Sequence, residues 1–327
     1  MSALFALASD TLTLLCRRRL FWLNIWLSVA VVLAVASMSC RPDGLSFGFG
    51  LKSWPSSYLT KGSPWETTLY FGVVRRTAQW WIVGAAPFLA LFSMATVLPK
   101  TLKSGQAALV FTKSRGRTEV LLGRFLGGLL FAAIPALISA FGLFLTLGWR
   151  LGVWESRLFL AVPFALLLFA ALAAVAVLLG VLTKSSSTAL AVTLLFAVSV
   201  FALQDAASRP SPSDDENEIK GLMHSASGGL VALQSFAWPL PRTQELMEGM
   251  DRLLGLRSPL LFRDLVRRWR IGKLRVGAAA TQVLEANQDA PAEPLTPLKL
   301  SEAILVTAGF SSLTLLAAAM LLNRRDL

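Results

Sequence analysis

Side chains that usually carry catalysis or bind metals are scarce in this chain, which has one histidine and two cysteines among 327 residues. The histidine, His224, lies in a polar stretch and is expected to be an ordinary solvated side chain. One histidine and two distant cysteines cannot supply the ligands of a structural zinc site or an HExxH motif. We therefore expect no metal, no cofactor and no catalytic centre.

Charged side chains are also scarce, at 15% of residues, whereas an average soluble protein has about 25%. Hydrophobic residues make up 55% of the chain, and the mean hydropathy is +0.62, which together indicate a multi-span membrane protein. The net charge of +12 would favour nucleic-acid binding in a soluble protein. No nucleic-acid-binding motif accompanies it, so we expect the basic loops to set membrane topology and to meet anionic lipids.

Six runs contain no Asp, Glu, Lys or Arg, and each is long enough to cross a hydrocarbon core of about 30 Å as a helix. These runs are 20–40, 77–99, 125–149, 158–183, 185–204 and 303–323. Charged groups inside spans usually mark proton or ion relays, so the composition of these runs disfavours a proton-driven pump. Only Lys184 and a short polar patch separate the fourth and fifth runs, which predicts a tight helical hairpin.

The positive charge of the loops predicts that both termini lie on the inner side of the membrane. With the N-terminus inside, the inner segments carry 12 Lys and Arg residues and the short outer loops carry 7. The long outer segment, 205–299, largely escapes this rule because of its length. Tryptophans near the ends of the runs are expected to be interfacial anchors. They are Trp22, Trp80, Trp81 and Trp149.

Three segments outside the runs have a predicted structure of their own. Residues 1–16 have leucines at near-helical spacing beside three arginines, which favours a helix along the inner membrane surface over a cytosolic extension of the first span. The first outer loop, 41–78, contains SFGFGL and TTLYFGVV, both of β-leaning composition, which predicts a small hairpin. In the second outer segment, a helix is predicted over 244–254 and an amphipathic segment over 261–276.

Three glycines, Gly123, Gly127 and Gly128, lie where the third run starts. Small residues spaced by four along a helix allow a second helix to approach closely. We therefore expect another helix to pack against this part of the third run.

The segment between the second and third runs resembles the permease subunits of type-2 ATP-binding-cassette exporters. It reads VLPKTLKSGQAALVFTKSRGRTEVLLGRFLGG, and the family pattern is an apolar residue and Pro, then Gly, an apolar helix, a basic turn and Leu-Gly-Lys/Arg. The positions that match are Pro99, Gly105, Leu109, Arg117, Gly123 and Arg124. The stretches GWRLGVWESRLF, FAWPLPRTQEL and LLNRRDL are similar to other parts of the family, so the resemblance covers nearly the whole chain.

The resemblance implies an all-α integral membrane protein with four parts. These are an interfacial amphipathic helix at 1–16, five spans within 17–204 with a cytoplasmic coupling segment at 100–124, an extracytoplasmic region at 205–299, and the sixth span with a cytoplasmic tail at 300–327. The chain departs from the family pattern at Lys100 and Lys103, where an acidic residue is common. It departs again at Ser114 and Gly116, where the basic turn often has a proline, so charge pairing in other permeases does not transfer.

The resemblance also implies that a short helix, about 103–113, docks into a groove on a separate ATP-binding subunit. Charge alone would favour a purely topological role, but the ALVF run between the charges favours docking into an apolar groove. The residues expected to bind the ATPase are Lys103, Gly105, Leu109, Phe111, Lys113, Arg115, Arg117 and Arg124. The chain itself lacks a nucleotide motif, since GVLTKSS at 180–186 has no second glycine.

The implied complex contains two ATP-binding subunits and two permeases, the second being a copy or a paralogue, in the inner membrane of a bacterium. Both termini would be cytoplasmic, and the expected partners are these subunits and membrane lipids, not nucleic acid. A non-transport membrane scaffold or assembly factor is the alternative function. An intramembrane enzyme ranks third, because the runs contain no paired acids, histidine cluster or serine–base pair.

Overall fold

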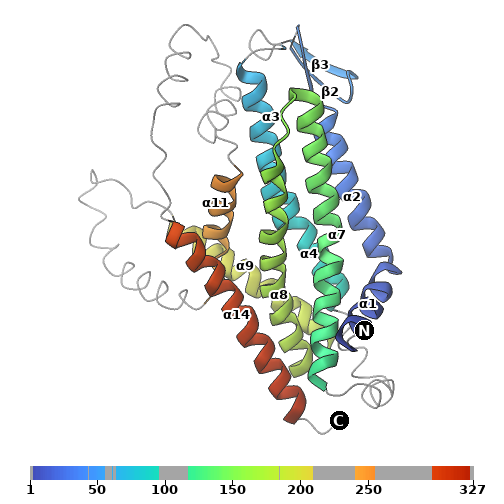
Figure 1. Ribbon diagram of the computed structural model, residues 1–327, viewed down its shortest axis with the longest axis vertical. Coiled ribbons are helices and arrows are strands. Elements are labelled where there is room, and N and C mark those ends of the chain that lie inside the picture. The colour runs from blue at the N-terminus through green and yellow to red at the C-terminus, as the bar shows by residue number, and fades with distance from the viewer. Residues whose placement is uncertain are drawn as a thin grey trace, which may run out of the picture.

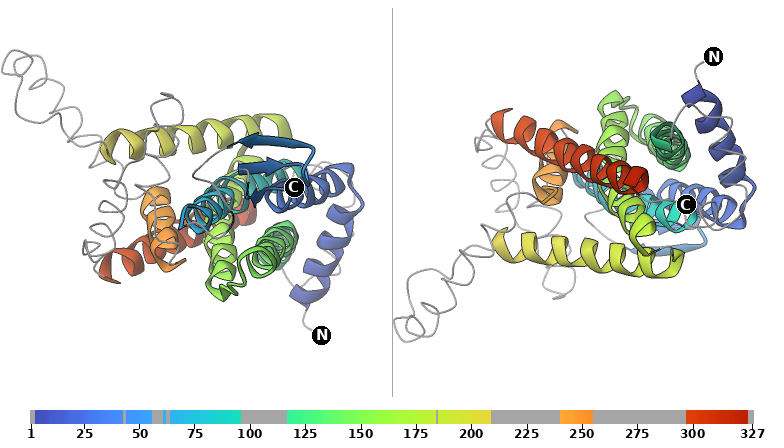
Figure 2. Two further views of the ribbon diagram at one scale, coloured as in Figure 1. Left: turned by 90° about the horizontal axis from the view of Figure 1, so that it is seen from above. Right: turned by 90° about the horizontal axis from the view of Figure 1, so that it is seen from below.

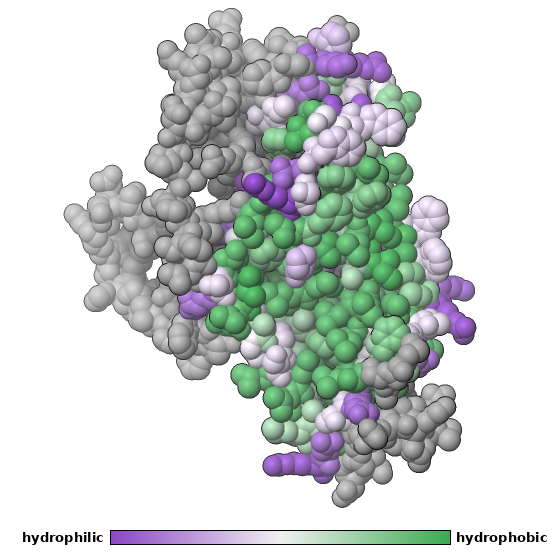
Figure 3. Space-filling model, viewed as in Figure 1, coloured by the Kyte–Doolittle hydropathy of each residue, from purple (hydrophilic) through white to green (hydrophobic). Residues whose placement is uncertain are grey.

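The computed structural model describes residues 3–42, 44–55, 61, 64–95, 117–183, 185–208, 240–254 and 297–324. Six helices in these ranges are long and apolar enough to cross a membrane (Figure 1). They are Arg19–Ala36, Glu66–Met94, Thr118–Leu151, Ser156–Thr183, Ser186–Gln204 and Leu300–Arg324. Figure 3 shows a broad hydrophobic band across the middle of the molecule, with hydrophilic residues gathered mainly toward its two ends. The chain is therefore built as a multi-pass membrane protein.

The N-terminal segment forms a helix of its own, α1 (Ala3–Cys16), which is separate from the first span, α2 (Arg19–Ala36). The chain turns between them because Arg18 has an extended backbone, with φ −83° and ψ 144°. Figure 2 shows α1 lengthwise and α7 (Arg117–Leu151) nearly end-on, so α1 crosses the bundle. The predicted separate helix is confirmed, and its place at the membrane surface stays a prediction.

The second span is longer than its apolar run. It consists of α3 (Pro64–Thr77), a π-helical segment η1 (Ala78–Ala85) and α4 (Ala86–Ala95). The prediction of a strand at TTLYFGVV is wrong, because these residues lie within α3. Proline in the first turn and Glu66 beside it favour helix initiation.

This extension of the second helix also moves two of the predicted anchors. Trp80 and Trp81 lie in η1, in the middle of the long helix and not at its end. The prediction that these two tryptophans lie at the end of a span is therefore wrong. Of the two, only Trp80 is exposed.

The fourth and fifth spans form the predicted hairpin. They are α8 (Ala161–Thr183), preceded by the short 3₁₀-helix η2 (Ser156–Leu160), and α9 (Ser186–Ser208). Helix α8 is the centre of the bundle and contacts α4, α7, α9 and α14 (Pro297–Arg324). By contrast, α9 and α14 expose apolar side chains along much of their length, as helices facing lipid do. Figure 1 shows that α1 and the last turn of α14 lie toward the same end of the bundle.

The opposite end of the bundle carries a three-stranded antiparallel sheet, β1 (Ser39–Arg41), β2 (Gly44–Phe47) and β3 (Lys52–Pro55). A hairpin in this loop is confirmed, but it is formed by β2 and β3, in which Phe47 pairs with Lys52, and SFGFGL supplies only the end of β2 and the turn. The all-α prediction is therefore right for the spans but misses this small sheet.

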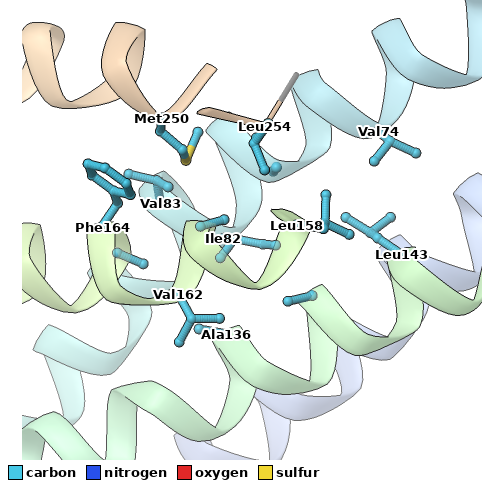
Figure 4. Close-up of a cluster of buried hydrophobic side chains, with 14 of the residues drawn as sticks. Val74, Ile82, Val83, Ala136, Leu143, Leu158, Val162, Phe164, Met250 and Leu254 are labelled. Atoms are coloured by element: carbon cyan, nitrogen blue, oxygen red, sulfur yellow. The ribbon is translucent and has the colours of Figure 1, made fainter. Parts of the chain in front are cut away.

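A buried cluster fills the half of the bundle nearer the sheet (Figure 4). Most of its members come from α3, η1, α7, α8 and from α11 (Thr243–Leu253), a short helix between the fifth and sixth spans. One face of α11 is fully buried there through Leu246, Met250 and the following Leu254. The helix predicted over 244–254 is thus confirmed, and the amphipathic segment predicted over 261–276 lies outside the described residues.

Candidate functional site

The structure describes only the last part of the predicted coupling segment 100–124, residues 117–124. Residues 96–116 lie outside the described ranges, and with them six of the predicted ATPase-binding residues. These are Lys103, Gly105, Leu109, Phe111, Lys113 and Arg115. The other two, Arg117 and Arg124, lie in the first turns of α7, and α4 ends at Ala95 on the other side of the segment.

The two helices on either side of the segment pack against each other at Met94 and Gly128. The side chain of Met94, in the last turn of α4, lies directly over Gly128 of α7, where it occupies the space that a Cβ atom would need. Helix α7 begins 11 residues before Gly128, which at 1.5 Å per residue is about 16 Å of helix. The first three turns of α7 therefore extend beyond the end of α4.

Helix α1 covers these first turns of α7. A Cβ atom on Gly123 would come within 2.6 Å of the Cβ of Leu7, and one on Gly127 within 2.7 Å of the carbonyl oxygen of Ala8. Real Cβ atoms do not approach other atoms so closely, so only glycine allows this contact. The prediction that a second helix packs on these glycines is confirmed, and that helix is α1.

Arg124 lies between the two glycines and is close enough to Asp10 of α1 for their charges to interact. The helix–helix contact that buries Gly123 and Gly127 therefore also brings the guanidinium of Arg124 near the carboxylate of Asp10. The sequence pattern predicts Arg124 on the partner surface, whereas the structure places it against α1. Its contact with the N-terminal helix depends on tertiary packing, so no sequence pattern indicated it.

The junction of α1 and α2 reaches the other end of the segment. The Nη1 atom of Arg18 donates a hydrogen bond of 3.3 Å to the carbonyl oxygen of Ser93, in the last turns of α4. Burial lowers the pKa of the Arg18 guanidinium from its ordinary value; an arginine remains charged nonetheless. The N-terminal 18 residues thus contact both helices that flank the coupling segment.

Two further polar contacts join α2 to the second span within the bundle. The side-chain amide of Asn24 donates to the carbonyl oxygen of Ala86 at 3.2 Å, and the indole Nε1 of Trp81 donates to the hydroxyl of Ser28 at 3.1 Å. Asn24 and Ser28 are buried and are spaced by four, so they lie on one face of α2. The sequence held this signal, a pair of polar residues at helical spacing in an apolar run, but it does not reveal the partner helix.

Trp81 and Ala86 also belong to the π-helical winding itself. The backbone N–H of Ala86 donates to the carbonyl of Trp81, five residues earlier. Such segments are rare and are frequent at functional positions. Polar side chains from α2 therefore meet the second span where its winding departs from the α-helix.

A second cluster of polar side chains lies where α9, α11 and α14 meet. Arg242 bridges two acids, with Nη1 at 3.2 Å from Glu245 and Nη2 at 3.1 Å from Glu302 of α14. A small apolar hollow adjoins it between α8 and α9, with Pro241 and Thr243 at its edge. The remaining residues that line the hollow are Leu168, Ala171, Leu172, Phe196, Ala197, Val200 and Phe201.

The chemistry available among the described residues is that of packing and binding. No group of three or more His, Cys, Asp or Glu in the described ranges could hold a metal ion. His224 lies outside these ranges, as do the residues of the predicted docking helix.

The fold and these contacts define a helical multi-pass membrane protein whose N-terminal helix packs on the first turns of the third span. A scan against protein-family models finds no match, and a search of curated proteins finds no similar sequence. The likeness to exporter permeases thus rests on the residue pattern.

Proposed function

We propose that the chain is the permease subunit of an ATP-binding-cassette exporter, coupled through the segment 100–124 to a separate ATPase. The observation that carries the proposal is the way the helices on either side of the segment are held. Arg18 contacts the last turns of α4, and α1 packs on the first turns of α7. A docking helix mounted on these ends would pass a push from an ATPase directly to the second and third spans.

Secure attachment is what such coupling requires. A force applied to a loop with free ends would move the loop and leave the spans where they are. Here Gly128 is packed under Met94, and Gly123 and Gly127 are packed under α1, so the flanking helices move with the N-terminal helix as one packed group. This packing supports the proposal, and the apolar ALVF run supplies the docking surface.

The proposed unit contains two such chains, or one chain and a paralogue, with two ATPases, because one six-span chain supplies half of a transport path. We place it in the inner membrane of a bacterium, with both termini cytoplasmic and transport directed outward. Lys103, Lys113, Arg115 and Arg117 would then face acids on the ATPase or the anionic inner leaflet.

The test is co-purification of the chain with an ATPase after two substitutions, Leu109→Asp and Phe111→Asp. The double variant is expected to insert into the membrane as before and to lose a phosphate-loop ATPase that the unchanged chain retains. Gln106→Asp with Thr112→Asp is a matched control, since it adds the same charge to the segment without removing apolar side chains. Retention of the ATPase by the Leu109 and Phe111 double variant contradicts the proposal, and purification of the unchanged chain without any ATPase favours a membrane scaffold.

A further inference from the structure

The turn between β2 and β3 folds back onto the end of the first span. The backbone N–H of Phe49 donates to the carbonyl oxygen of Ser37 at 3.2 Å, and that of Gly48 donates to the Ser37 hydroxyl at 3.4 Å. Ser37 is the residue that caps α2, and the membrane-spanning stretch ends one residue before it, at Ala36. The turn therefore lies at the end of the apolar stretch that forms the first span.

This turn exposes large apolar side chains. Leu51 is 93% exposed and Phe49 is 67% exposed, and Phe47 and Trp54 on the adjoining strands are exposed as well. Single exposed apolar residues are ordinary, but these four share one hairpin. Contiguous apolar side chains on a surface mark a place that something else covers.

The backbone of the turn is shaped to hold this arrangement. Phe49 has a φ of 59°, in the left-handed region that residues other than glycine seldom adopt, between Gly48 at 67° and Gly50 at 103°. A side chain at Gly50 would meet the guanidinium of Arg41, which lies across the turn. The hydrogen bonds to Ser37 thus fix an unfavourable conformation that leaves the phenyl ring outside the protein.

Basic and aromatic groups surround the apolar turn. The Nζ atom of Lys52 lies 5.1 Å from the centre of the Trp54 ring, and Arg41 spans the turn from β1. Trp149 marks the same level on α7, since the neighbouring Arg150 donates from Nη2 to the carbonyl of Ala36 at 2.7 Å. Trp149 is itself 90% exposed. Aromatic and basic side chains at the end of a span are typical of the boundary between acyl chains and headgroups.

We propose that the Phe47–Leu51 turn is an interfacial anchor that inserts into the leaflet at the end of the bundle opposite the termini. Phe49 and Leu51 enter the boundary between headgroups and acyl chains, and Arg41 and Lys52 lie near lipid phosphates. The phospholipid bilayer is the occupant because the turn is hydrogen-bonded to the residue that caps a membrane span and carries positive charge. The anchor does not depend on the proposed transport function.

The anchor can be tested with spin labels at the two ends of strand β2. In a chain with Cys16→Ala and Cys40→Ala, one variant carries Leu51→Cys in the apolar turn. The matched control is a variant with Pro42→Cys, in the turn between β1 and β2 at the other end of strand β2. The side chain at position 42 is also exposed. Both variants are reconstituted into vesicles of phosphatidylcholine and phosphatidylglycerol, and collision rates are measured with oxygen, which concentrates in lipid, and with a water-soluble nickel complex.

The label at position 51 is expected to have a severalfold higher ratio of oxygen to nickel collisions than the label at position 42. Equal ratios, with nickel reaching both labels, would overturn the lipid anchor and leave the patch to a protein partner. The unmodified chain provides an independent measurement in vesicles that contain a phospholipid with a diazirine at the start of its acyl chain. Light-induced adducts are expected on residues 47–54, and their absence there, with adducts on the spans, also contradicts the proposal.

Discussion

The hydroxyl of Thr243 donates a hydrogen bond of 2.6 Å to the side-chain oxygen of Gln204, and the amide of Gln204 donates to the carbonyl of Pro241, also at 2.6 Å. One side chain near the end of α9 thus holds the beginning of α11 through both of its polar groups. Because α11 buries Met250 and its neighbours among the spans, this junction fixes how the inter-span helix enters the bundle.

Replacing Gln204 with Leu should destabilise the α9–α11 junction. The hydroxyl of Thr243 would lose its acceptor, at a cost of about 1–3 kcal/mol. The carbonyl of Pro241 would lose one of its two donors and keep the backbone N–H of Thr243, at 2.9 Å. Thermal unfolding in detergent should show a lower Tm. Gln204→Glu keeps the acceptor for Thr243 and removes the donor to Pro241, so its Tm should fall between those of the unchanged chain and Gln204→Leu. An unchanged Tm for Gln204→Leu would contradict the role of the junction.

Replacing Gly127 with Val should displace α1 from α7. Its Cβ would meet the backbone of Ala8 and the side chain of Thr11, both at 2.7 Å, and overpacking of this kind costs about 1–3 kcal/mol. Hydrogen exchange over residues 3–16 should become faster. Gly309→Val is the matched control, because nothing lies within 4 Å of a Cβ at that position of α14; equal exchange in the two variants would argue against the glycine contact.

The bridge between Arg242 and Glu302 should contribute little to stability. Glu302 is 51% exposed and Arg242 is 17% exposed, so solvent screens the pair, and the expected coupling is about 0.5–1 kcal/mol. A double-mutant cycle with Arg242→Ala and Glu302→Ala measures it through thermal unfolding. The coupling should shrink as salt is raised toward about 1 M, and a coupling of several kcal/mol would show that the pair is more buried than its exposure indicates.

The thiol of Cys40 should react slowly at neutral pH. Burial, followed by the nearby Glu66 carboxylate, raises the pKa of Cys40 to about 11, although Arg150 opposes the shift. A raised pKa keeps the thiol protonated to higher pH, so at about pH 8 the reactive thiolate is about a thousandth of the total, and the fraction increases as pH rises toward the pKa.

Labelling with a water-soluble maleimide in a Cys16→Ala chain tests this expectation. Cys40 should label much more slowly when folded than after denaturation in detergent, and its rate should rise as the pH approaches the pKa. A chain with Cys16→Ala, Cys40→Ala and Pro42→Cys is the control, because position 42 is exposed. Equal rates at positions 40 and 42 would show that the thiol is neither buried nor shifted in pKa.

The spans were predictable because length and apolar composition are sufficient to identify a membrane helix. The α8–α9 hairpin and α11 followed from the same local patterns. The start of the second helix was predicted too late, because Arg75 and Arg76 mark the start of the charge-free run. In the structure the helix continues through both arginines, since a charged side chain leaves the backbone hydrogen bonds of a helix intact. The sequence therefore located the hydrophobic part of that helix and missed its extension.

The contacts of the helices around the coupling segment were harder to predict from the sequence. Glycine spacing indicated that a helix packs on Gly123 and Gly127, but several helices were possible partners, and only the folded chain identifies α1. The pairing of Asn24 with Ala86 depends likewise on how α2 is rotated against the second span. Such contacts are set by tertiary packing, which residue spacing within one helix does not encode.

Helix α7 runs for 35 residues with Pro135 near its middle. A proline has no N–H to donate, so the carbonyl four residues earlier, on Phe131, loses its helical partner, and the helix bends most easily there. The two halves are fastened to different neighbours, since Gly127 packs on α1 and Gly142 packs on Val32 of α2. Pro135 is therefore the most easily bent point of one continuous helix, and it separates the half that packs on α1 from the half that packs on α2.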